Sequence, residues 1–403
     1  MTKYFYTCCY LDCPRRRIDA SKTYYYLEAN GWEPARNISD ANLVVIFTCG
    51  GFDFTESRSV KTIQKALSSK KKKGKVVVTG CLLKINPDSF THLAEAEVIP
   101  DNELHKLDTL IHASKLYDEF PDANCIPGIM GLEDFSIFRR WAGRFNFNVN
   151  FIKTLTTAFQ KKLKKKRHTA SPFFRDLFNI KISQGCLGNC TYCALKIAHG
   201  KLQSKHPDRI IEEFRKGLDM GFKLFLFVTQ DMGCYGLDIG TDIFTLLKSA
   251  FEEKGDFQLI ITDFNVHWLI KDQKLLDLLT THRDRIEEIR IPIQSGSDKI
   301  LKLMKRPYTK EEAYNVLTQI REKMPGVKVN THFIVGFPGE THENFLETAR
   351  LIDNFDFHNI DIFCYQDRPG VESVALPNKI STKIKVKRAQ ELGTKGHHIN
   401  IIY

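Results

Sequence analysis

The stretch Cys186-Leu187-Gly188-Asn189-Cys190-Thr191-Tyr192-Cys193 places three cysteines at CxxxCxxC spacing in one short loop. Closely spaced cysteine thiolates are the usual ligands of iron–sulfur clusters, which normally take four. A closed structural zinc site is the alternative, but it needs four nitrogen or sulfur ligands, usually as two nearby pairs. The spacing therefore favours a [4Fe-4S] cluster on Cys186, Cys190 and Cys193, with one iron left open for an exogenous ligand.

The composition indicates a folded chain rather than a disordered one. Its 403 residues are 42% hydrophobic and 27% charged, enough for a sizeable core in two or three domains. The first residues contain no apolar region of signal-peptide length, and no run reaches the roughly 20 apolar residues of a membrane span. We expect a cytoplasmic monomer without membrane contact, whose 11 cysteines are reduced metal ligands rather than disulfides.

The chain is basic, with 59 Lys and Arg residues against 48 Asp and Glu residues and a formal net charge of +11. This balance favours a polyanionic or ribosome-associated partner. Part of the excess lies in two basic runs, at 70–73 and 161–167. Such runs are also common in solvated helix ends and flexible linkers, so both interpretations stay open.

The first hundred residues alternate strand-like and helix-like segments, which predicts a parallel α/β sheet. The predicted strands cover 3–9, 43–48 and 75–79, and the predicted helices cover 21–30 and 57–68. A cysteine follows each strand, namely Cys13, Cys49 and Cys81. Ligands of open parallel sheets lie beyond the carboxyl ends of the strands, so these cysteines can converge on a second three-thiolate site.

The second half of the chain predicts a barrel. Six strand candidates lie at 179–183, 222–229, 257–262, 288–293, 327–333 and 360–365, and helical segments at 207–220, 242–253, 271–280, 310–323 and 340–354 alternate with them. This alternation fits a partial (βα)6 barrel, with the CxxxCxxC loop after its first strand. Catalytic residues of βα barrels gather at the C-terminal face, where this loop would lie.

The same sequence patterns predict the domain boundaries. We predict an N-terminal domain at 1–120, a basic connector or insertion with one or two helices at 121–175, the barrel at 176–380 and a short polar tail at 381–403. The connector is longer than a simple linker, which leaves a functional role and a surface helix covering the seam as equal alternatives.

With both thiolate sites in view, the chain resembles the methylthiotransferases of the radical S-adenosylmethionine (SAM) superfamily, which place a methylthio group on tRNA adenosines or on a ribosomal-protein aspartate. The blocks that carry the resemblance are FTC at 47–49, VVTGC at 77–81, ISQGC at 182–186, PIQSGS at 292–297, LMKRPYT at 303–309 and IVGFPGET at 334–341. The resemblance implies a flavodoxin-like N-terminal parallel-sheet domain and a radical SAM partial (βα)6 TIM barrel.

The resemblance also implies two [4Fe-4S] clusters and SAM as cofactors. The cluster on Cys186, Cys190 and Cys193 would cleave SAM, with Tyr192 near the adenine, whereas Cys13, Cys49 and Cys81 would hold an auxiliary cluster that carries the sulfur. Uncharged polar groups and a tight turn at strand ends suit contacts with SAM, and the candidates are Gln230, Gln294, Ser295, Ser297 and Gly336. An external reductant such as flavodoxin or ferredoxin and a sulfur source would be needed.

Four departures from the family pattern are visible. The first block, G-C-x-x-N-x-x-D-S, appears as DCPRRRIDA at 12–20, so Cys8 and Cys9 compete with Cys13 as the first ligand. R-G-x-x-x-S-R appears as HGKLQSK at 199–205, and the family's Glu on the second barrel strand appears as Leu224. The chain ends where the RNA-gripping TRAM domain would begin, which leaves a tRNA base and a protein or peptide residue both open as substrate.

Two other functions stay open at this point. One is a related radical SAM enzyme that uses the N-terminal cluster for electron transfer or binding, and the other is a non-catalytic iron–sulfur or zinc protein that binds RNA. Three cysteines, Cys125, Cys234 and Cys364, have no assigned role, and burial as free thiols is the default expectation for each.

Overall fold

The computed structural model describes residues 2–10, 13–69, 74–90, 95–124, 130–131, 177–395 and 398–403. The chain divides into two compact units, residues 1–83 with 87–175 and residues 84–86 with 176–403. Within the described ranges, no helix combines the length and the apolar character needed to cross a membrane.

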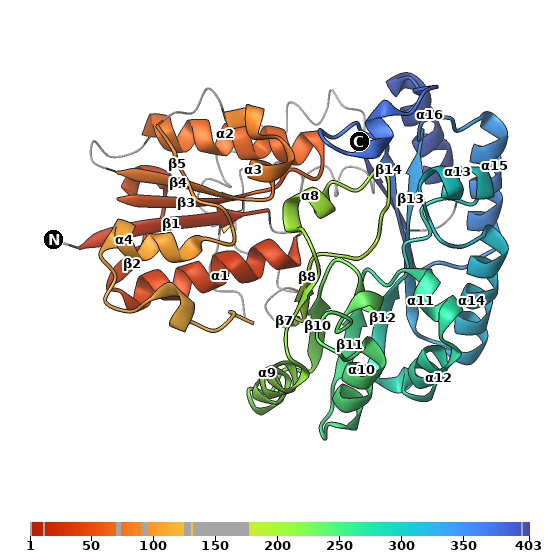
Figure 1. Cartoon of the computed structure of the whole chain (residues 1–403), viewed down its shortest axis with the longest axis horizontal. Helices are drawn as coiled ribbons and strands as arrows, with labels where there is room; N and C mark the ends of the chain where they lie inside the picture. Colours follow the sequence, from red (N-terminus) through yellow and green to blue (C-terminus); the bar gives the residue numbers. More distant parts are fainter. Residues whose placement is uncertain are drawn as a thin grey trace, which may run out of the picture. The chain divides into compact units, whose positions relative to one another are not determined.

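The N-terminal unit is built on a parallel sheet with strand order β2-β1-β3-β4-β5, and β6 also pairs with β1 (Figure 1). The strands are β1 (Lys3–Cys9), β2 (Trp32–Pro34), β3 (Leu43–Thr48), β4 (Lys75–Gly80), β5 (Glu97–Val98) and β6 (Met130–Gly131). Every residue of β3 is buried, as expected for a parallel strand whose two faces are both covered. The predicted parallel α/β sheet is confirmed, with β1 and β3 at the predicted bounds.

Helices cover both faces of this sheet. Figure 1 shows α1 (Pro14–Ala29) and α4 (Leu107–Ile111) on one side, and α2 (Asp53–Ser69) and α3 (Leu82–Ile85) on the other. Helix α1 begins seven residues before the predicted 21–30, because Pro14 is well suited to a first helical turn. The sequence did not reveal this first turn, because it contains three buried arginines rather than periodically spaced apolar residues.

The second unit is a partial barrel of parallel strands with helices outside it (Figure 1). Its seven-stranded sheet runs in reverse chain order through β15 (Ile399–Ile402), β14 (Asn359–Cys364), β13 (Lys328–Val335), β12 (Ile286–Arg290), β11 (Gln258–Ile261), β10 (Leu224–Val228) and β7 (Leu177–Lys181). The longer outer helices are α9 (Pro207–Asp219), α10 (Ile243–Glu252), α12 (Gln273–Thr281), α14 (Lys310–Lys323) and α15 (His342–Asp353). All six predicted strands are present.

Several short elements follow the C-terminal ends of these strands. They are the hairpin of β8 (Ser183–Gln184) and β9 (Gln203–Ser204), the helices α8 (Leu195–His199), α11 (Val266–Lys271) and α13 (Asp298–Leu303), and a 3-10 turn at Met232–Cys234. The cluster loop lies between β8 and α8, at the predicted end of the barrel strands.

The prediction of a polar tail at 381–403 is wrong for the residues that the structure describes there. Helix α16 (Thr382–Gly393) and β15 belong to the barrel unit, and β15 pairs with β14 in parallel. Arg388, Ala389 and Leu392 bury one face of α16. A single short helix and a four-residue strand carry too little periodicity to stand out from polar surroundings in the sequence.

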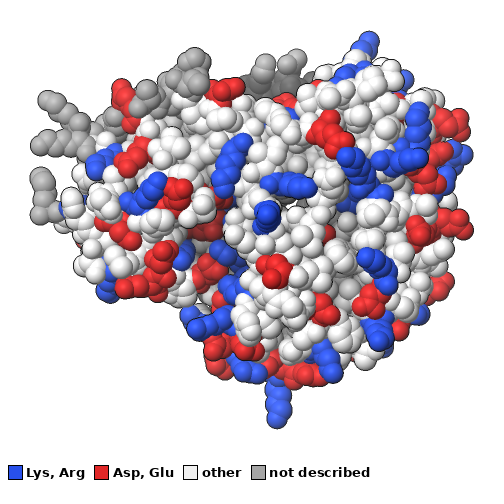
Figure 2. Space-filling model, viewed as in Figure 1, with Lys and Arg blue, Asp and Glu red and all other residues white. Residues whose placement is uncertain are grey.

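The two predicted basic runs, at 70–73 and 161–167, and almost all of the connector at 121–175 lie outside the described residues. On the face shown in Figure 2, Lys and Arg side chains are interspersed with Asp and Glu side chains. The described surface of that face therefore does not form one uninterrupted basic area.

Candidate active site and metal centres

Each of the three predicted cysteines of the N-terminal unit lies beyond the end of a strand. Cys13 is the N-cap of α1, Cys49 follows β3 and Cys81 follows β4. The thiols of Cys49 and Cys81 share a hydrogen bond, and the amide N–H of Gly50 donates to Cys81 Sγ at 3.3 Å. The charge of Cys81 raises the pKa of Cys13, and the charge of Cys13 raises the pKa of Cys49.

Hydrogen bonding and nearby charge shift the pKa values of Cys49 and Cys81 in opposite directions. The hydrogen bond from Cys49, followed by the Arg16 charge and the Gly50 N–H, lowers the pKa of Cys81 to about 6. The same hydrogen bond and burial raise the pKa of Cys49 well above its usual value. One thiolate is thus already favoured at neutral pH, and thiolate is the form that ligates a metal.

The rival cysteines occupy the apolar layers of the sheet. Cys8 packs among the residues beneath α2 and Cys9 among those beneath α1, since neighbouring residues of a strand face opposite sides. Both are fully buried, and burial raises the pKa of Cys8 to about 12. Cys13, in contrast, is the N-cap of α1 and is only partly buried, and its role as the first ligand stays a prediction.

A buried arginine triplet, Arg15, Arg16 and Arg17, follows Cys13, and the sequence analysis did not assign it a role. Arg16 donates to the carboxylates of Asp19 at 3.0 Å and Asp101 at 2.8 Å. Its charge also lowers the pKa of Cys13, although burial raises that pKa overall. The signal in the sequence was the three consecutive arginines that follow Cys13-Pro14, and their effect is a cationic environment that favours sulfur anions.

In the barrel unit, N–H donors reach the sulfurs of the cluster loop. The Gly188 N–H lies 3.1 Å from Cys186 Sγ, and Arg306 Nη1 lies 3.4 Å from Cys190 Sγ. Burial raises the pKa of Cys193 to about 11. All three cysteines of the loop remain partly exposed. Hydrogen bonds to the sulfurs and solvent exposure both influence the reduction potential of an iron–sulfur cluster.

Gln230 and Thr191 hold this loop in place. Gly185 has φ +80°, and a Cβ there would lie 2.2 Å from the Lys201 carbonyl oxygen, so only glycine fits. The Gly185 N–H donates to Gln230 Oε1 at 2.7 Å. Thr191 binds the turn after α13, with its N–H on the carbonyl of Met304 at 3.2 Å. Gln230, predicted as a SAM contact, therefore positions the cluster loop in the described structure.

Tyr192 and Gly336 lie where the cluster loop meets the turn after β13. The rings of Tyr192 and Phe337 are 6.4 Å apart in an edge-to-face arrangement, within an apolar cluster that also contains Met304. Gly336 has φ +71°, and its N–H donates to Glu340 Oε1 at 3.0 Å. The tight turn predicted from Gly336 is confirmed, whereas contacts of either residue with SAM stay a prediction.

The segment after β12 brings three predicted residues into the core, but two of their side chains bind α15. Ser297 Oγ accepts from Asn344 Nδ2 at 3.0 Å, and Ser295 Oγ lies 3.4 Å from Thr348 Oγ1. Gln294 is buried at φ +73° and pairs with β13 through its backbone. The serines therefore position this turn against α15, and their predicted contact with SAM stays untested.

Four residues around the cluster loop were missed as a group: Asp231, Cys234, Trp268 and Arg306. The Sγ atoms of Cys186 and Cys234 and a carboxylate oxygen of Asp231 all lie within 4.8 Å of one another. Trp268 Nε1 donates to Asp231 Oδ2 at 3.1 Å, and burial raises the pKa of Asp231. Asp231 and Cys234 follow β10, whereas Trp268 follows β11 and Arg306 follows β12, so no local spacing could reveal that all four meet.

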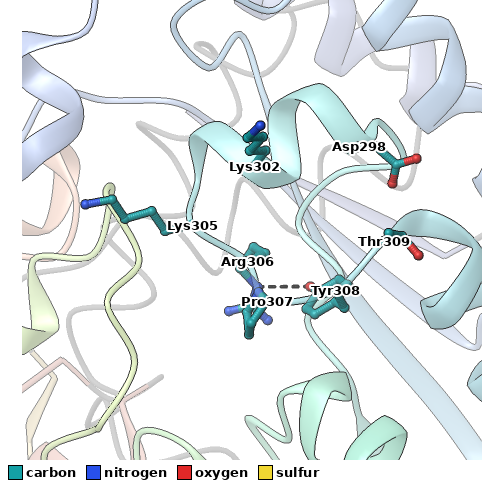
Figure 3. A pocket seen from close by; sticks show the side chains of 7 residues that line it. All are labelled: Asp298, Lys302, Lys305, Arg306, Pro307, Tyr308 and Thr309. Atoms are coloured by element: carbon teal, nitrogen blue, oxygen red, sulfur yellow. Dashed lines mark hydrogen bonds between the residues drawn. The ribbon is translucent and has the colours of Figure 1, made fainter.

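A cavity of about 460 Å³ adjoins the segment that carries Arg306 (Figure 3). Its lining consists of Asp298, Lys302, Lys305, Arg306, Pro307, Tyr308 and Thr309. Arg306 Nε donates to the Tyr308 hydroxyl at 2.9 Å, the bond drawn in Figure 3. The basic residues of the cavity wall thus lie in the same turn as the donor to Cys190.

Each of the two structural units resembles a known protein family. A family model described as the radical SAM superfamily matches residues 180–352, and one described as uncharacterized protein family UPF0004 matches residues 6–99. The chain is 28% identical to the ribosomal protein uS12 methylthiotransferase RimO of Protochlamydia amoebophila, covering 95% of the chain and 74% of the relative. It is also 28% identical to a probable threonylcarbamoyladenosine tRNA methylthiotransferase of Pyrococcus horikoshii, with 89% and 76% covered.

A third relative is the tRNA-2-methylthio-N(6)-dimethylallyladenosine synthase of Lawsonia intracellularis, 28% identical over 91% of this chain and 76% of its own. Among solved structures, the radical SAM methyltransferase TsrM of Kitasatospora setae superposes with a TM-score of 0.59 at 12% identity, covering 93% of this chain and 77% of TsrM. At that identity the superposition shows the fold alone. The chain is thus similar along nearly its whole length to radical SAM methylthiotransferases, and its two units match the radical SAM and UPF0004 family models separately.

Proposed function

We propose that this enzyme transfers a methylthio group to a C–H carbon of a tRNA base or of a protein or peptide residue, using two [4Fe-4S] clusters and two molecules of SAM. The observation that carries the proposal is the pair of separate three-thiol sets, Cys186, Cys190 and Cys193 in the barrel and Cys13, Cys49 and Cys81 at the N-terminal sheet. Each set supplies three protein sulfurs and leaves a coordination position for another ligand.

Cys186, Cys190 and Cys193 would hold the barrel cluster, which would supply the electron for reductive cleavage of SAM. The chain's own residues orient that chemistry and exclude side reactions. Gln230 and Thr191 fix the loop, and Arg306 fixes Cys190 through a bond to its sulfur. Tyr192 places an aromatic ring beside the same loop, where an adenine could stack.

At the N-terminal set, the residues favour a negatively charged sulfur group. Arg16 lies beside Cys13 and Cys81, and the Gly50 N–H points at the Cys81 sulfur. This arrangement supports a site that holds the sulfur to be transferred, supplied by an external sulfur source, with electrons from a reductant such as flavodoxin or ferredoxin.

A macromolecular substrate fits both the family and the charge of the chain. The relatives with 28% identity include enzymes named for ribosomal protein uS12 and for tRNA, so identity does not separate the two substrates. The net charge of +11 favours a substrate that is, or lies within, a polyanionic particle. Reaction with bulk tRNA and with ribosomal subunits, compared in parallel, distinguishes the two.

The proposal is tested by anaerobic reconstitution of four proteins. The parent chain should carry two clusters' worth of iron, and changing either cysteine set to alanine should remove about half of it. Loss of Cys186, Cys190 and Cys193 should abolish SAM cleavage, whereas loss of Cys13, Cys49 and Cys81 should leave it. Cys364→Ala is the matched control, because Cys364 is a buried thiol at the end of β14 that belongs to neither set.

The reaction products provide the decisive readout. A methylthiotransferase yields methionine, 5′-deoxyadenosine and S-adenosylhomocysteine together, since one SAM gives the radical and another gives the methyl group. Methionine and 5′-deoxyadenosine without S-adenosylhomocysteine would instead indicate a related enzyme that uses SAM only as a radical source.

A further inference from the structure

We propose that Cys234 is a positioning residue of the radical SAM cluster, whose S–H donates a hydrogen bond to the Cys186 sulfur and thereby raises the reduction potential of the cluster. The inference rests on the proposed cluster at Cys186, Cys190 and Cys193. It assigns a role to a fourth cysteine that the CxxxCxxC pattern does not include.

The first observation is where the Cys234 thiol lies. Cys234 ends the 3-10 turn after β10, and its Sγ is within 4.8 Å of Cys186 Sγ. The residue is fully buried, so water does not compete for its proton. The thiol therefore lies close to a predicted cluster ligand.

The single proton of Cys234 has two acceptors within reach. Besides Cys186, the backbone carbonyl of Asp231 lies 3.2 Å from Cys234 Sγ. A bond to an anionic sulfur is stronger than a bond to a neutral carbonyl oxygen, because the charge assists it. Once Cys186 is a metal-bound thiolate, donation to its sulfur is favoured over donation to the carbonyl.

The surrounding contacts leave the Cys234 side chain little freedom. A Cβ on the preceding residue, Gly233, would lie 2.1 Å from Trp268 Cγ, so the turn lies flat against the indole. Trp268 Nε1 donates to Asp231 Oδ2 at 3.1 Å, and the Gly233 N–H donates to Asp231 Oδ1 at 3.3 Å. Trp268 and Asp231 thus fix the turn from both sides, and a fixed donor costs no reorganisation when the cluster changes charge.

The consequence follows from how iron–sulfur clusters are tuned. Reduction adds negative charge that is shared with the ligand sulfurs, so a hydrogen bond to a sulfur stabilises the reduced form more than the oxidised form. Hydrogen bonds to sulfur are one of the established determinants of cluster potential. Removing the Cys234 donor should therefore make the cluster harder to reduce.

The experiment uses the full chain carrying Cys13→Ala, Cys49→Ala and Cys81→Ala, so that only the barrel cluster is present. In this background we compare Cys234→Ala, Cys234→Ser and the buried-thiol control Cys364→Ala. Iron per chain is measured first, and the midpoint potential is then determined by redox titration followed by electron paramagnetic resonance. We expect a lower midpoint for Cys234→Ala, and parent-like values for Cys234→Ser, which keeps a donor, and for Cys364→Ala.

Each other result overturns the proposal. An unchanged midpoint in Cys234→Ala, with iron retained, would show that the thiol does not act on the cluster. Equal shifts in the alanine and serine variants would indicate packing rather than hydrogen bonding. Loss of iron in Cys234→Ala but not in Cys364→Ala would make Cys234 a ligand. Absence of iron in the unmodified background would instead contradict the proposed cluster itself.

Discussion

Arg306 connects the cluster loop to the strand ends through four polar contacts. Its Nη1 reaches Cys190 Sγ at 3.4 Å, its Nη2 donates to Asn265 at 2.9 Å and to the Pro292 carbonyl at 3.0 Å, and its Nε donates to the Tyr308 hydroxyl. A single lysine ammonium cannot span these directions, because it is a point charge rather than a planar fork.

Arg306→Gln should therefore slow SAM cleavage, measured as 5′-deoxyadenosine formed without substrate. Hydrogen bonds to charged groups contribute about 1.5–3 kcal/mol, which corresponds to roughly ten- to a hundredfold in rate. Arg306→Lys should not restore the rate. The control is Lys302→Gln, an exposed residue in the wall of the same cavity. A full rate in Arg306→Lys would show that charge alone suffices.

The environment of Asp361 predicts how the free energy of unfolding of the barrel depends on pH. Burial alone would raise its pKa, but the hydrogen bond and charge of His332, 3.3 Å away, and a hydrogen bond from Asn400 hold the pKa well below its usual range. The unfolded chain takes up this proton near pH 3.9, before the folded chain does. The stabilisation is thus complete above about pH 5 and is lost as the pH falls below the unfolded value.

Asp361→Asn should lower the free energy of unfolding of the cluster-free chain at pH 7 by about 1–3 kcal/mol. The difference between parent and variant should shrink between pH 5 and pH 3, as the parent loses its stabilisation. Urea titrations at several pH values measure this, with the exposed Asp356→Asn as control. A difference that does not depend on pH would contradict the assignment.

At the scale of elements, α16 is fixed to the barrel by a buried ion pair. Arg388 Nη1 pairs with Glu340 Oε1, and the two side chains are 10% and 2% exposed. Glu340 also accepts from the Gly336 N–H, so the pair links α16 to the turn after β13. Breaking a buried pair leaves one charge without compensation.

Arg388→Met should therefore destabilise the barrel by about 3–5 kcal/mol, whereas the neighbouring exposed Lys387→Met should change little. Hydrogen exchange measures the same effect locally, and amides of β15 and β14 should exchange faster in the Arg388 variant. Unaltered protection of these two strands would show that α16 does not hold the edge of the sheet.

For the whole molecule, the basic excess predicts how substrate binding depends on salt. Acidic and basic side chains are interspersed on the face in Figure 2. The run at 161–167, which lies outside the described residues, contains six basic residues and Leu163. Each Lys or Arg that neutralises an RNA phosphate adds about 0.7–0.9 to the slope of log affinity against log salt.

Changing Lys161, Lys162, Lys164, Lys165, Lys166 and Arg167 to Gln should flatten that slope and weaken binding of bulk tRNA, while SAM cleavage without substrate stays unchanged. Titrations of the parent and the variant at several salt concentrations provide the measurement. An identical slope in both proteins would remove the connector from RNA binding and favour a protein or peptide substrate.

Much of this enzyme was determined by short-range sequence. The CxxxCxxC spacing places three thiols in one loop whatever the rest of the chain does, and alternating apolar segments predicted both parallel sheets. Cys49 and Cys81 could be paired in advance, because each directly follows a strand and neighbouring parallel strands end at the same edge. The bounds of β3 and the turn at Gly336 followed from the same local rules.

Only the tertiary structure decided which distant side chains meet. Cys234 and Asp231, from the loop after β10, lie near Cys186, and Trp268 from α11 binds Asp231. Arg306 reaches Cys190 across 116 positions of sequence. Only the structure shows that the hydroxyls of Ser295 and Ser297, predicted to contact SAM, lie within hydrogen-bond distance of α15. The physical reason is that spacing and periodicity report only on neighbours along the chain, whereas hydrogen bonds between strand ends depend on how the whole sheet closes.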